Sequence, residues 1–284
     1  ARLKYFYKFH KMPNYEHPTD INEKINWNNF YGDISRWADL ADKYKVREYV
    51  QSLGLGDTLV KLYGRWDKAS DIDWDRLPNQ FVLKVNNGCG DILICRDKDK
   101  LDKATVIDTY DRLVSIKYGD VTGEPHYARI QPCVIAEELL DINKQSINTS
   151  SLIDYKVWCL NGKPYCIWCA WNRGKEGADT GVYDLDWNYH PEWSVFTEHY
   201  RQGKEILPKP KCFERMLEVA SKLSEEFPIL RVDLYEVNEK IYFGELTFTS
   251  LGGFMDYLTS EVLLDMGSKV RINEISEEYA HVKC

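Results

Sequence analysis

The pattern of apolar and polar positions divides the chain into a helical beginning and a strand-rich remainder. The first eighty residues favour helix, and Asp20 followed by Glu23 has the spacing of a helix-starting capping box. A second helix is expected over residues 39–52, because a pair of glycines, Gly54 and Gly56, follows directly. The opening of the chain is therefore predicted to be a helical segment.

From about residue 58 the pattern changes to short β-rich runs bounded by Gly, Asp or Pro. The predicted strands are 59–63, 81–85, 92–95, 134–137, 155–160, 165–171, 230–237 and 240–247, with helices at 101–118 and 211–227. Asn161-Gly162 separates two of these strands, and Asn-Gly is the strongest short signal for a hairpin. Asn238-Glu239 separates the last two. Hairpins without a regular βαβ alternation predict an α+β fold.

Composition narrows the class of protein. The chain has 284 residues, 44% hydrophobic and 29% charged, enough for one large domain or a few smaller ones. A net charge of −8 argues against a nucleic-acid partner, although a few local cations suffice to bind a small polyanion. No apolar run approaches the length of a membrane span, about 20 residues, and no signal peptide is recognisable. We expect a cytoplasmic protein.

The eight cysteines are too sparse for a disulfide scaffold, and most lie among strand-like apolar residues. Cys166-x-x-Cys169 has half the spacing of a zinc site, but no second pair or suitably spaced histidines accompany it. The sequence therefore favours reduced, buried thiols.

A lysine and a glycine-containing loop form the first group of residues with possible chemistry. Lys84 stands near the end of the 81–85 strand, and residues 86–90 follow before the next strand. Glycines let backbone N–H groups approach an anion, and a lysine in an apolar strand needs an anionic partner. The segment is either a phosphate cradle or a hairpin with an exposed lysine.

The second group follows the 134–137 strand, where Glu137 and Glu138 precede Leu139 and Leu140. Such a strand end provides backbone amides and an apolar slot for a purine ring. A solvated acidic turn would produce the same pattern.

The third group lies on the Asn-Gly hairpin. With a side-chain period of two, Asp154 and Lys156 face the same side of one strand, and Arg173 stands at the far end of its partner. The three residues form either an anion-binding set or a surface salt bridge of little energetic value.

The fourth group lies on the last predicted hairpin. Arg231 and Asp233 share one face of their strand, and Glu245 and Thr247 share one face of theirs. Adjacent strands would bring two carboxylates, a hydroxyl and a guanidinium to one spot. Hard oxygen ligands of this kind suit Mg²⁺ shared with a phosphate-bearing substrate.

The order of these groups resembles the ATP-grasp superfamily, and more narrowly its TupA-like branch, linked to bacterial cell-surface polysaccharide and teichuronopeptide synthesis. Three stretches are typical of that branch: Asn22-Glu-Lys-Ile-Asn-Trp27, Ala41-Asp-Lys-Tyr-Lys-Val-Arg-Glu-Tyr-Val50 and Gly244-Glu-Leu-Thr-Phe-Thr249. The resemblance runs from about residue 18 to about residue 258. It implies an ATP-grasp fold with two α+β subdomains clasping ATP, at 58–140 and 141–284, after a helical segment at 1–57.

The resemblance also implies roles for individual residues. The ATP phosphates would be held by Lys43, Lys84, Lys156, Asn86, Asn87, Gly88 and Gly90. The adenine hinge and a residue near the ribose would be Glu137, Glu138, Leu139, Leu140 and Asp154. The catalytic cations would be Arg231, Arg173 and Lys156, and the magnesium ligands Asp233, Glu245 and Thr247.

Two departures from the superfamily pattern stand out. Many ATP-grasp enzymes have Glu-x-Asn where this chain has Glu245-Leu-Thr247, which leaves one metal less firmly held or differently liganded. The N-terminal substrate domain common in the superfamily is reduced to a helical segment, so the substrates cannot be inherited from relatives.

The implied activity is an ADP-forming carbon–nitrogen ligase that uses ATP and Mg²⁺ to join a carboxylate, expected on a uronic acid of a capsule or cell-surface polysaccharide, to an amine. A sugar kinase of the same fold is the nearest alternative. A metal-dependent glycosyltransferase is another, because Asp184-Leu-Asp186 has the Asp-x-Asp form of a nucleotide-sugar site. The same residues also fit a solvated turn.

Overall fold

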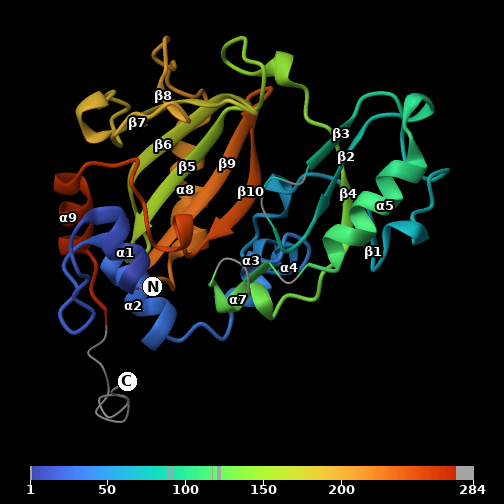
Figure 1. Ribbon diagram of the computed structural model, residues 1–284. Coiled ribbons are helices and arrows are strands. Elements are labelled where there is room, and N and C mark those ends of the chain that lie inside the picture. Colours follow the sequence, from blue (N-terminus) through green and yellow to red (C-terminus); the bar gives the residue numbers. More distant parts are fainter. Residues whose placement is uncertain (1, 89, 91, 117, 120–122, 273–284) are drawn as a thin grey trace. The chain divides into compact units, whose positions relative to one another are not determined.

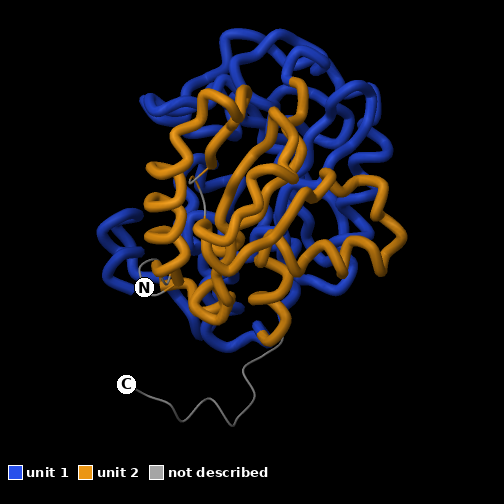
Figure 2. Tube along the Cα trace, turned by 90° about the vertical axis from the view of Figure 1, so that its right-hand side faces the viewer, with its two compact units in different colours: residues 1–34, 142–284 blue, residues 35–141 orange. Residues whose placement is uncertain are grey.

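Two structural units make up the chain. One unit (unit 1) contains residues 1–34 and 142–284, and the other (unit 2) contains residues 35–141 (Figure 2). The computed structural model describes residues 2–88, 90, 92–116, 118–119 and 123–272. Helices of the expected N-terminal segment, 1–57, are divided between the two units. The division into subdomains at 58–140 and 141–284 stays a prediction.

Unit 1 is built on a six-stranded sheet in the order β10-β9-β5-β6-β7-β8 (Figure 1). Neighbouring strands are antiparallel except β7 and β8, which are parallel. The strands are Asp154–Leu160 (β5), Lys163–Gly174 (β6), Gly177–Tyr183 (β7), Tyr200–Gln202 (β8), Ile229–Val237 (β9) and Lys240–Thr247 (β10).

Both predicted hairpins of unit 1 are confirmed. β5 pairs with β6 around Asn161 and Gly162, whose φ angles are 49° and 73°. β9 pairs with β10 around Asn238 and Glu239, at 55° and 57°. Positive φ at both central residues is what a type I′ turn requires, and this turn matches the twist of the strands that it joins.

Helices cover both faces of this sheet. They are Arg2–Phe9 (α1), Ile21–Tyr31 (α2), Phe213–Ser224 (α8) and Ser260–Lys269 (α9), with 3₁₀ turns at Ile142–Lys144, Pro191–Trp193 and Ser250–Gly252. On one face, Cys159 Sγ lies 3.8 Å from the Ala220 carbonyl oxygen of α8. On the other, Trp158 packs in a core with Ile25 of α2 and Met266 of α9. No helix of the described residues is long and apolar enough to cross a membrane.

The capping box predicted from Asp20 and Glu23 is confirmed at the start of α2. The Glu23 backbone N–H donates to Asp20 Oδ1 over 2.9 Å, which fixes where the helix begins. Lys24 then donates to the carbonyl oxygens of Gly267 and Val270, both over 2.7 Å, at the end of α9. Because the last carbonyls of a helix lack partners within it, this lysine ties α2 to α9.

Unit 2 contains a four-stranded antiparallel sheet in the order β1-β4-β2-β3. Its strands are Leu62–Trp66 (β1), Phe81–Val85 (β2), Ile92–Cys95 (β3) and Val134–Glu137 (β4). Its helices and 3₁₀ turns are Trp37–Ala41 (α3), Val46–Ser52 (α4), Lys103–Val114 (α5), Pro125–Ala128 (α7), Gly56–Thr58, Ala69–Asp71 and Lys98–Lys100. Leu83 packs in one core with Val106 and Tyr110 of α5, so its neighbour Lys84 projects from the opposite face.

Several predicted boundaries are wrong. The single helix expected over 39–52 is two helices, because the Asp42 carboxylate accepts hydrogen bonds from the Tyr44 and Lys45 backbone N–H groups and turns the chain. The strand expected over 59–63 begins only at Leu62. The helix expected over 101–118 covers Lys103–Val114, with Asp102 as its N-cap.

Candidate functional site

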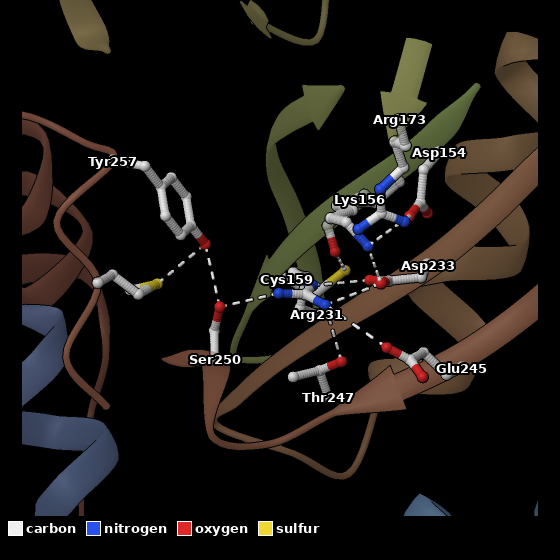
Figure 3. Close-up of polar contacts among 12 residues, drawn as sticks. Asp154, Lys156, Cys159, Arg173, Arg231, Asp233, Glu245, Thr247, Ser250 and Tyr257 are labelled. Carbon is white, nitrogen blue, oxygen red and sulfur yellow. Dashed lines mark hydrogen bonds and ion pairs between the residues drawn. The ribbon is translucent and has the colours of Figure 1, made fainter. Parts of the chain in front are cut away.

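A row of three charged side chains crosses three neighbouring strands of the unit 1 sheet, from β5 through β9 to the edge strand β10. Lys156 on β5 lies opposite Asp233 on β9, and Asp233 lies opposite Glu245 on β10. The Lys156 ammonium contacts the Asp233 carboxylate directly (Figure 3). Lys156 and Asp233 are buried, whereas the Glu245 side chain is 31% exposed. The row therefore presents a carboxylate to solvent beside a buried ion pair.

A β-bulge places Glu245 in this row. The register of the β9–β10 pair shifts between Phe243 and Glu245, so that Gly244 is left without a partner. Regular pairing would put Glu245 opposite Val232 and turn its side chain to the other face of the sheet. Gly244 suits the position because a Cβ there would lie 2.9 Å from the Asp233 carbonyl oxygen. The bulge thus brings the two carboxylates to the same face.

Arg231 lies one row further along the same face, opposite Thr247. Its guanidinium donates to Asp233 through Nε and Nη2 over 2.7 and 2.8 Å, and to Thr247 Oγ1 over 3.0 Å. Its Nη1 donates to Ser250 Oγ over 2.8 Å. Burial by itself lowers the pKa of the guanidinium, but the Asp233 carboxylate raises the pKa well above its usual value. Arg231 is a fixed, permanent cation in this site.

Asp154 and Arg173 extend the cluster at the start of β5. The Asp154 Oδ2 atom accepts from Lys156 Nζ over 2.7 Å and from Arg173 Nη1 over 2.8 Å. Its Oδ1 atom is buried and has no hydrogen-bond partner among the described residues. Buried polar atoms are usually satisfied, so this oxygen is a candidate to accept a bond from a bound ligand. Arg173, with a side chain 51% exposed, is the most accessible cation of the cluster.

Three residues of the cluster were missed by the sequence analysis. Tyr235 follows Arg231 and Asp233 at a spacing of two, and burial together with Asp154, Glu245 and Asp233 raises the pKa of its hydroxyl. Ser250 and Tyr257 hold Arg231 from the loop after β10, with their hydroxyl oxygens 3.0 Å apart. The period of two was a signal for Tyr235, but no local pattern places a loop serine beside Arg231.

In unit 2, Lys84 and Glu137 form an ion pair on the face of the sheet away from α5. Lys84 Nζ lies 2.6 Å from Glu137 Oε2, and Arg47 Nη1 of α4 lies 3.3 Å from Glu137 Oε1. Lys84 is opposite Ile135 and Glu137 opposite Val82, so the pair is a diagonal contact between neighbouring strands. Glu137 thus holds a lysine whose side chain is 21% exposed.

The loop after β2 is held by side-chain hydrogen bonds. Lys43 Nζ donates to the Gly88 carbonyl oxygen over 2.6 Å. The buried Asn86 side chain accepts from the Cys133 backbone N–H and donates to the Gln131 carbonyl oxygen. Asn87 donates to the Ile116 carbonyl oxygen over 3.4 Å. Gly90 has a φ of 91°, and Cys89 lies outside the described residues. In this structure the side chains of Lys43 and Asn86 shape the loop.

The segment predicted as the adenine hinge leaves the sheet after Glu137. The Glu138 backbone N–H donates to the Lys61 carbonyl oxygen over 2.9 Å, beside β1. Leu140 is buried and Glu138 is exposed. The role of residues 137–140 in binding adenine stays a prediction.

A protein-family model described as TupA-like ATP-grasp matches residues 23–271. The chain belongs to this family. Among solved structures, a D-alanine–D-alanine ligase from Bacillus anthracis is similar at 16% identity and a TM-score of 0.49, over 82% of this chain and 67% of that one. The D-alanine–D-alanine ligase from Helicobacter pylori is similar at 12% identity and a TM-score of 0.45, over 89% of this chain and 67% of that one. An N5-carboxyaminoimidazole ribonucleotide synthetase from Thermus thermophilus is similar at 9% identity and a TM-score of 0.42, over 80% of this chain and 52% of that one. No curated protein matches.

Membership of the TupA-like family confirms the predicted ATP-grasp α+β fold. The first of the three family-typical stretches, Asn22 to Trp27, has a structural explanation: it supplies the glutamate of the α2 capping box, the bonds to α9 and part of the unit 1 core.

The predicted magnesium ligands of this ATP-grasp chain offer a suitable donor set. Asp233 and Glu245 supply carboxylate oxygens from opposed strands. Those of Asp233 accept from Arg231 and Lys156, and Thr247 Oγ1 accepts from Arg231. Among the described residues there is no group of three or more His, Cys, Asp or Glu that could hold a metal. Two carboxylates nevertheless fit Mg²⁺, which usually keeps several waters and shares substrate phosphates.

The Asp184-Leu-Asp186 sequence forms a turn. The Asp184 carboxylate accepts from the Asp186 and Asn188 backbone N–H groups, over 3.0 and 2.7 Å, and contacts His190 Nε2 at 3.1 Å. Its oxygens are therefore used within the turn. Cys166 and Cys169 are both buried and free, as expected for thiols in a strand.

Proposed function

We propose that this chain is an ADP-forming carbon–nitrogen ligase that uses Mg-ATP to couple a carboxylate to an amine. The observation that supports this best is the row of Lys156, Asp233 and Glu245 beside Arg231, in a member of an ATP-grasp family. It combines fixed cations with an accessible carboxylate. Phosphoryl transfer asks a protein mainly for positioning and charge neutralisation, which these groups supply without a protein nucleophile.

The proposed reaction has two steps. An oxygen of the substrate carboxylate attacks the γ-phosphorus of ATP, so that ADP leaves and an acyl phosphate forms. The nitrogen of the amine then attacks the acyl carbon, phosphate leaves, and the amine loses a proton to solvent. Orienting the two reactants supplies on the order of 7–11 kcal/mol of barrier reduction.

The proposal gives roles in ATP binding to residues of unit 2. In unit 2, Lys84 and the loop of Asn87, Gly88 and Gly90 bind phosphate oxygens, with Lys43 and Asn86 holding the loop. Residues 137–140 contact the adenine. The ion pair with Glu137 supports this role, because it keeps the Lys84 ammonium extended across the sheet face before ATP arrives.

In unit 1, Arg173 and Lys156 bind phosphate oxygens, Asp154 lies near the ribose, and Arg231 stabilises charge on the group being transferred. Asp233 and Glu245 would hold Mg²⁺, with Thr247 as a weaker third ligand. When bound, the ion neutralises phosphate charge and polarises the phosphorus–oxygen bond. The Asp154 Oδ1 atom, buried without a hydrogen-bond partner among the described residues, supports ligand binding at this end of the cluster.

The proposed acceptor is a uronic acid of a bacterial cell-surface polysaccharide, and the site of action is the cytoplasm. A sugar kinase would use the same phosphate-binding residues with a hydroxyl as acceptor. A glycosyltransferase at Asp184 is less well supported, because the family that matches this chain is an ATP-grasp family. Mass spectrometry of products formed from ATP, a uronic acid and a panel of amines tests the proposal. An amide supports the ligase, and a stable sugar phosphate supports the kinase.

A further inference from the structure

The loop that follows β10 reaches into the cluster and is held by helix α2. Ser250 and Tyr257 lie at its two ends: Ser250 Oγ accepts from Arg231 Nη1 and lies 3.0 Å from the Tyr257 hydroxyl oxygen (Figure 3). Burial raises the pKa of the Tyr257 hydroxyl to about 12, so it stays protonated, and it donates to Met255 Sδ over 3.2 Å. The position of Arg231 therefore depends on this loop as well as on Asp233.

The loop has an unusual backbone. Leu251, Gly252 and Gly253 have successive positive φ angles of 49°, 66° and 77°. Leu251 is a non-glycine residue in the left-handed region, and such conformations persist only where surrounding contacts enforce them. The Leu251 side chain is 42% exposed, so packing of that side chain does not enforce it.

Two buried asparagines of α2 supply the enforcing contacts. Asn22 donates through Nδ2 to the Met255 carbonyl oxygen and accepts at Oδ1 from the Met255 N–H, both over 2.9 Å. Asn26 donates to the Gly253 carbonyl oxygen over 2.7 Å. Asn22 and Asn26 are 0% and 2% exposed, so these bonds do not compete with water. A Cβ on Gly253 would lie 2.5 Å from Asn26 Nδ2, so glycine is needed here for the contact.

We propose that Asn22 and Asn26 are positioning residues of the active site: they fix the loop over residues 250–257 and, through Ser250 and Tyr257, the guanidinium of Arg231. The coupling passes from α2 to the cluster through hydrogen bonds that all lie within unit 1. Its catalytic part rests on the proposed function. Asn22 and Asn26 themselves touch no reacting atom.

The first test measures the loop without reference to activity. Hydrogen–deuterium exchange at the Gly252, Gly253 and Met255 amides is compared in wild type, Asn26→Ala and Asn29→Ala. Asn29 is a matched control, because it is buried on the same helix and its Oδ1 has no hydrogen-bond partner among the described residues. We expect Asn26→Ala to exchange faster at these amides. Equal exchange in the two variants overturns the proposal. Gly253→Ala, which pushes against Asn26, replaces Asn26→Ala if that variant does not fold.

The second test asks whether the asparagine acts through Ser250. We expect Asn26→Ala and Ser250→Ala each to lower carboxylate-dependent ADP release by about tenfold to a hundredfold, with ATP affinity unchanged. The double variant should be no slower than the slower single variant, because both changes release the same guanidinium. The positioning role is overturned if the double variant loses rate by the product of the two single losses. It is also overturned if Asn26→Ala loses no more rate than Asn29→Ala. If wild type itself shows no carboxylate-dependent ADP release, the proposed function fails, and the exchange test alone decides the role of the asparagines.

Discussion

Glu245 lies opposite Asp233 only because the strand that carries it contains a bulge at Gly244. The two residues differ in how they can be tested. Asp233 is buried and bonded to Arg231 and Lys156, so its replacement removes a carboxylate from two buried cations and costs about 3–5 kcal/mol of stability. Glu245 is partly exposed, so it is the better probe of metal binding.

We predict that Glu245→Gln abolishes most ATP turnover at saturating magnesium while leaving the protein folded, because phosphate charge is no longer neutralised. Steady-state ADP release and circular dichroism measure the two effects. The matched control is the double variant Asp184→Asn with Asp186→Asn, in which the amide oxygens can still accept the bonds of the turn. If the double variant loses ATP turnover and Glu245→Gln keeps it, the active site lies at the Asp-x-Asp turn and the glycosyltransferase is favoured.

Lys84→Ala is expected to remove the stabilisation by Mg-ATP. A ligand that binds only the folded state, at a hundredfold over its Kd, adds about 2.7 kcal/mol, which a thermal shift assay detects. The variant should stay folded, because Glu137 keeps its contact with Arg47. Lys100→Ala, at an exposed surface pair, serves as the control and should keep the full shift. A full shift in Lys84→Ala would exclude this lysine from the phosphate site.

The hairpin glycine gives a prediction about stability alone. Gly162 has a φ of 73°, and a Cβ there would lie 2.9 Å from Glu225 Cα. We expect Gly162→Ala to lower the free energy of unfolding by about 1–3 kcal/mol. Gly174→Ala is the control, because a Cβ there meets no atom within 4 Å. Urea denaturation compares the two, and equal midpoints would count against the turn described here.

Strand positions could be predicted where a local rule acts alone. Phe81–Val85, Ile92–Cys95, Val134–Glu137 and Lys240–Thr247 begin and end where the apolar runs and turn residues indicate. The hairpin at Asn161-Gly162 follows from the backbone freedom of that pair. The capping box of Asp20 and Glu23 is likewise a local hydrogen-bond pattern.

The rest depended on contacts that are distant in sequence. β7, Gly177–Tyr183, carries glycines and polar residues and becomes a strand because β6 and β8 pair with it. The helix break at Asp42 depends on a side chain competing with the backbone. Ser250 contacts Arg231 from a loop that α2 binds through Asn26, more than two hundred residues away in the sequence. The alternation of residues predicted Arg231 beside Asp233, but not the groups that fix their orientation.

Buried His126 predicts an acid dependence of stability. Burial, aided by Arg129, lowers the pKa of His126 to about 4, so the folded protein keeps the imidazole neutral where the unfolded chain, with a pKa near 6.5, binds a proton. Stability from this group is therefore full above about pH 6.5 and falls as the pH drops towards 4, by about 3 kcal/mol in all. Urea titrations of wild type and His126→Gln over this range measure it. If the free energy of unfolding falls equally with pH in the two proteins, His126 is not the source of the acid dependence.

The central claim is that this protein uses ATP to activate a carboxylate, and trapping with hydroxylamine tests this most directly. With Mg-ATP, a uronic acid and hydroxylamine in place of the amine, the account predicts a hydroxamate in amounts equal to the ADP released. ADP release should fall to background without the uronic acid or in Glu245→Gln. ADP release that requires only a neutral sugar, with a stable sugar phosphate and no hydroxamate, would contradict the account.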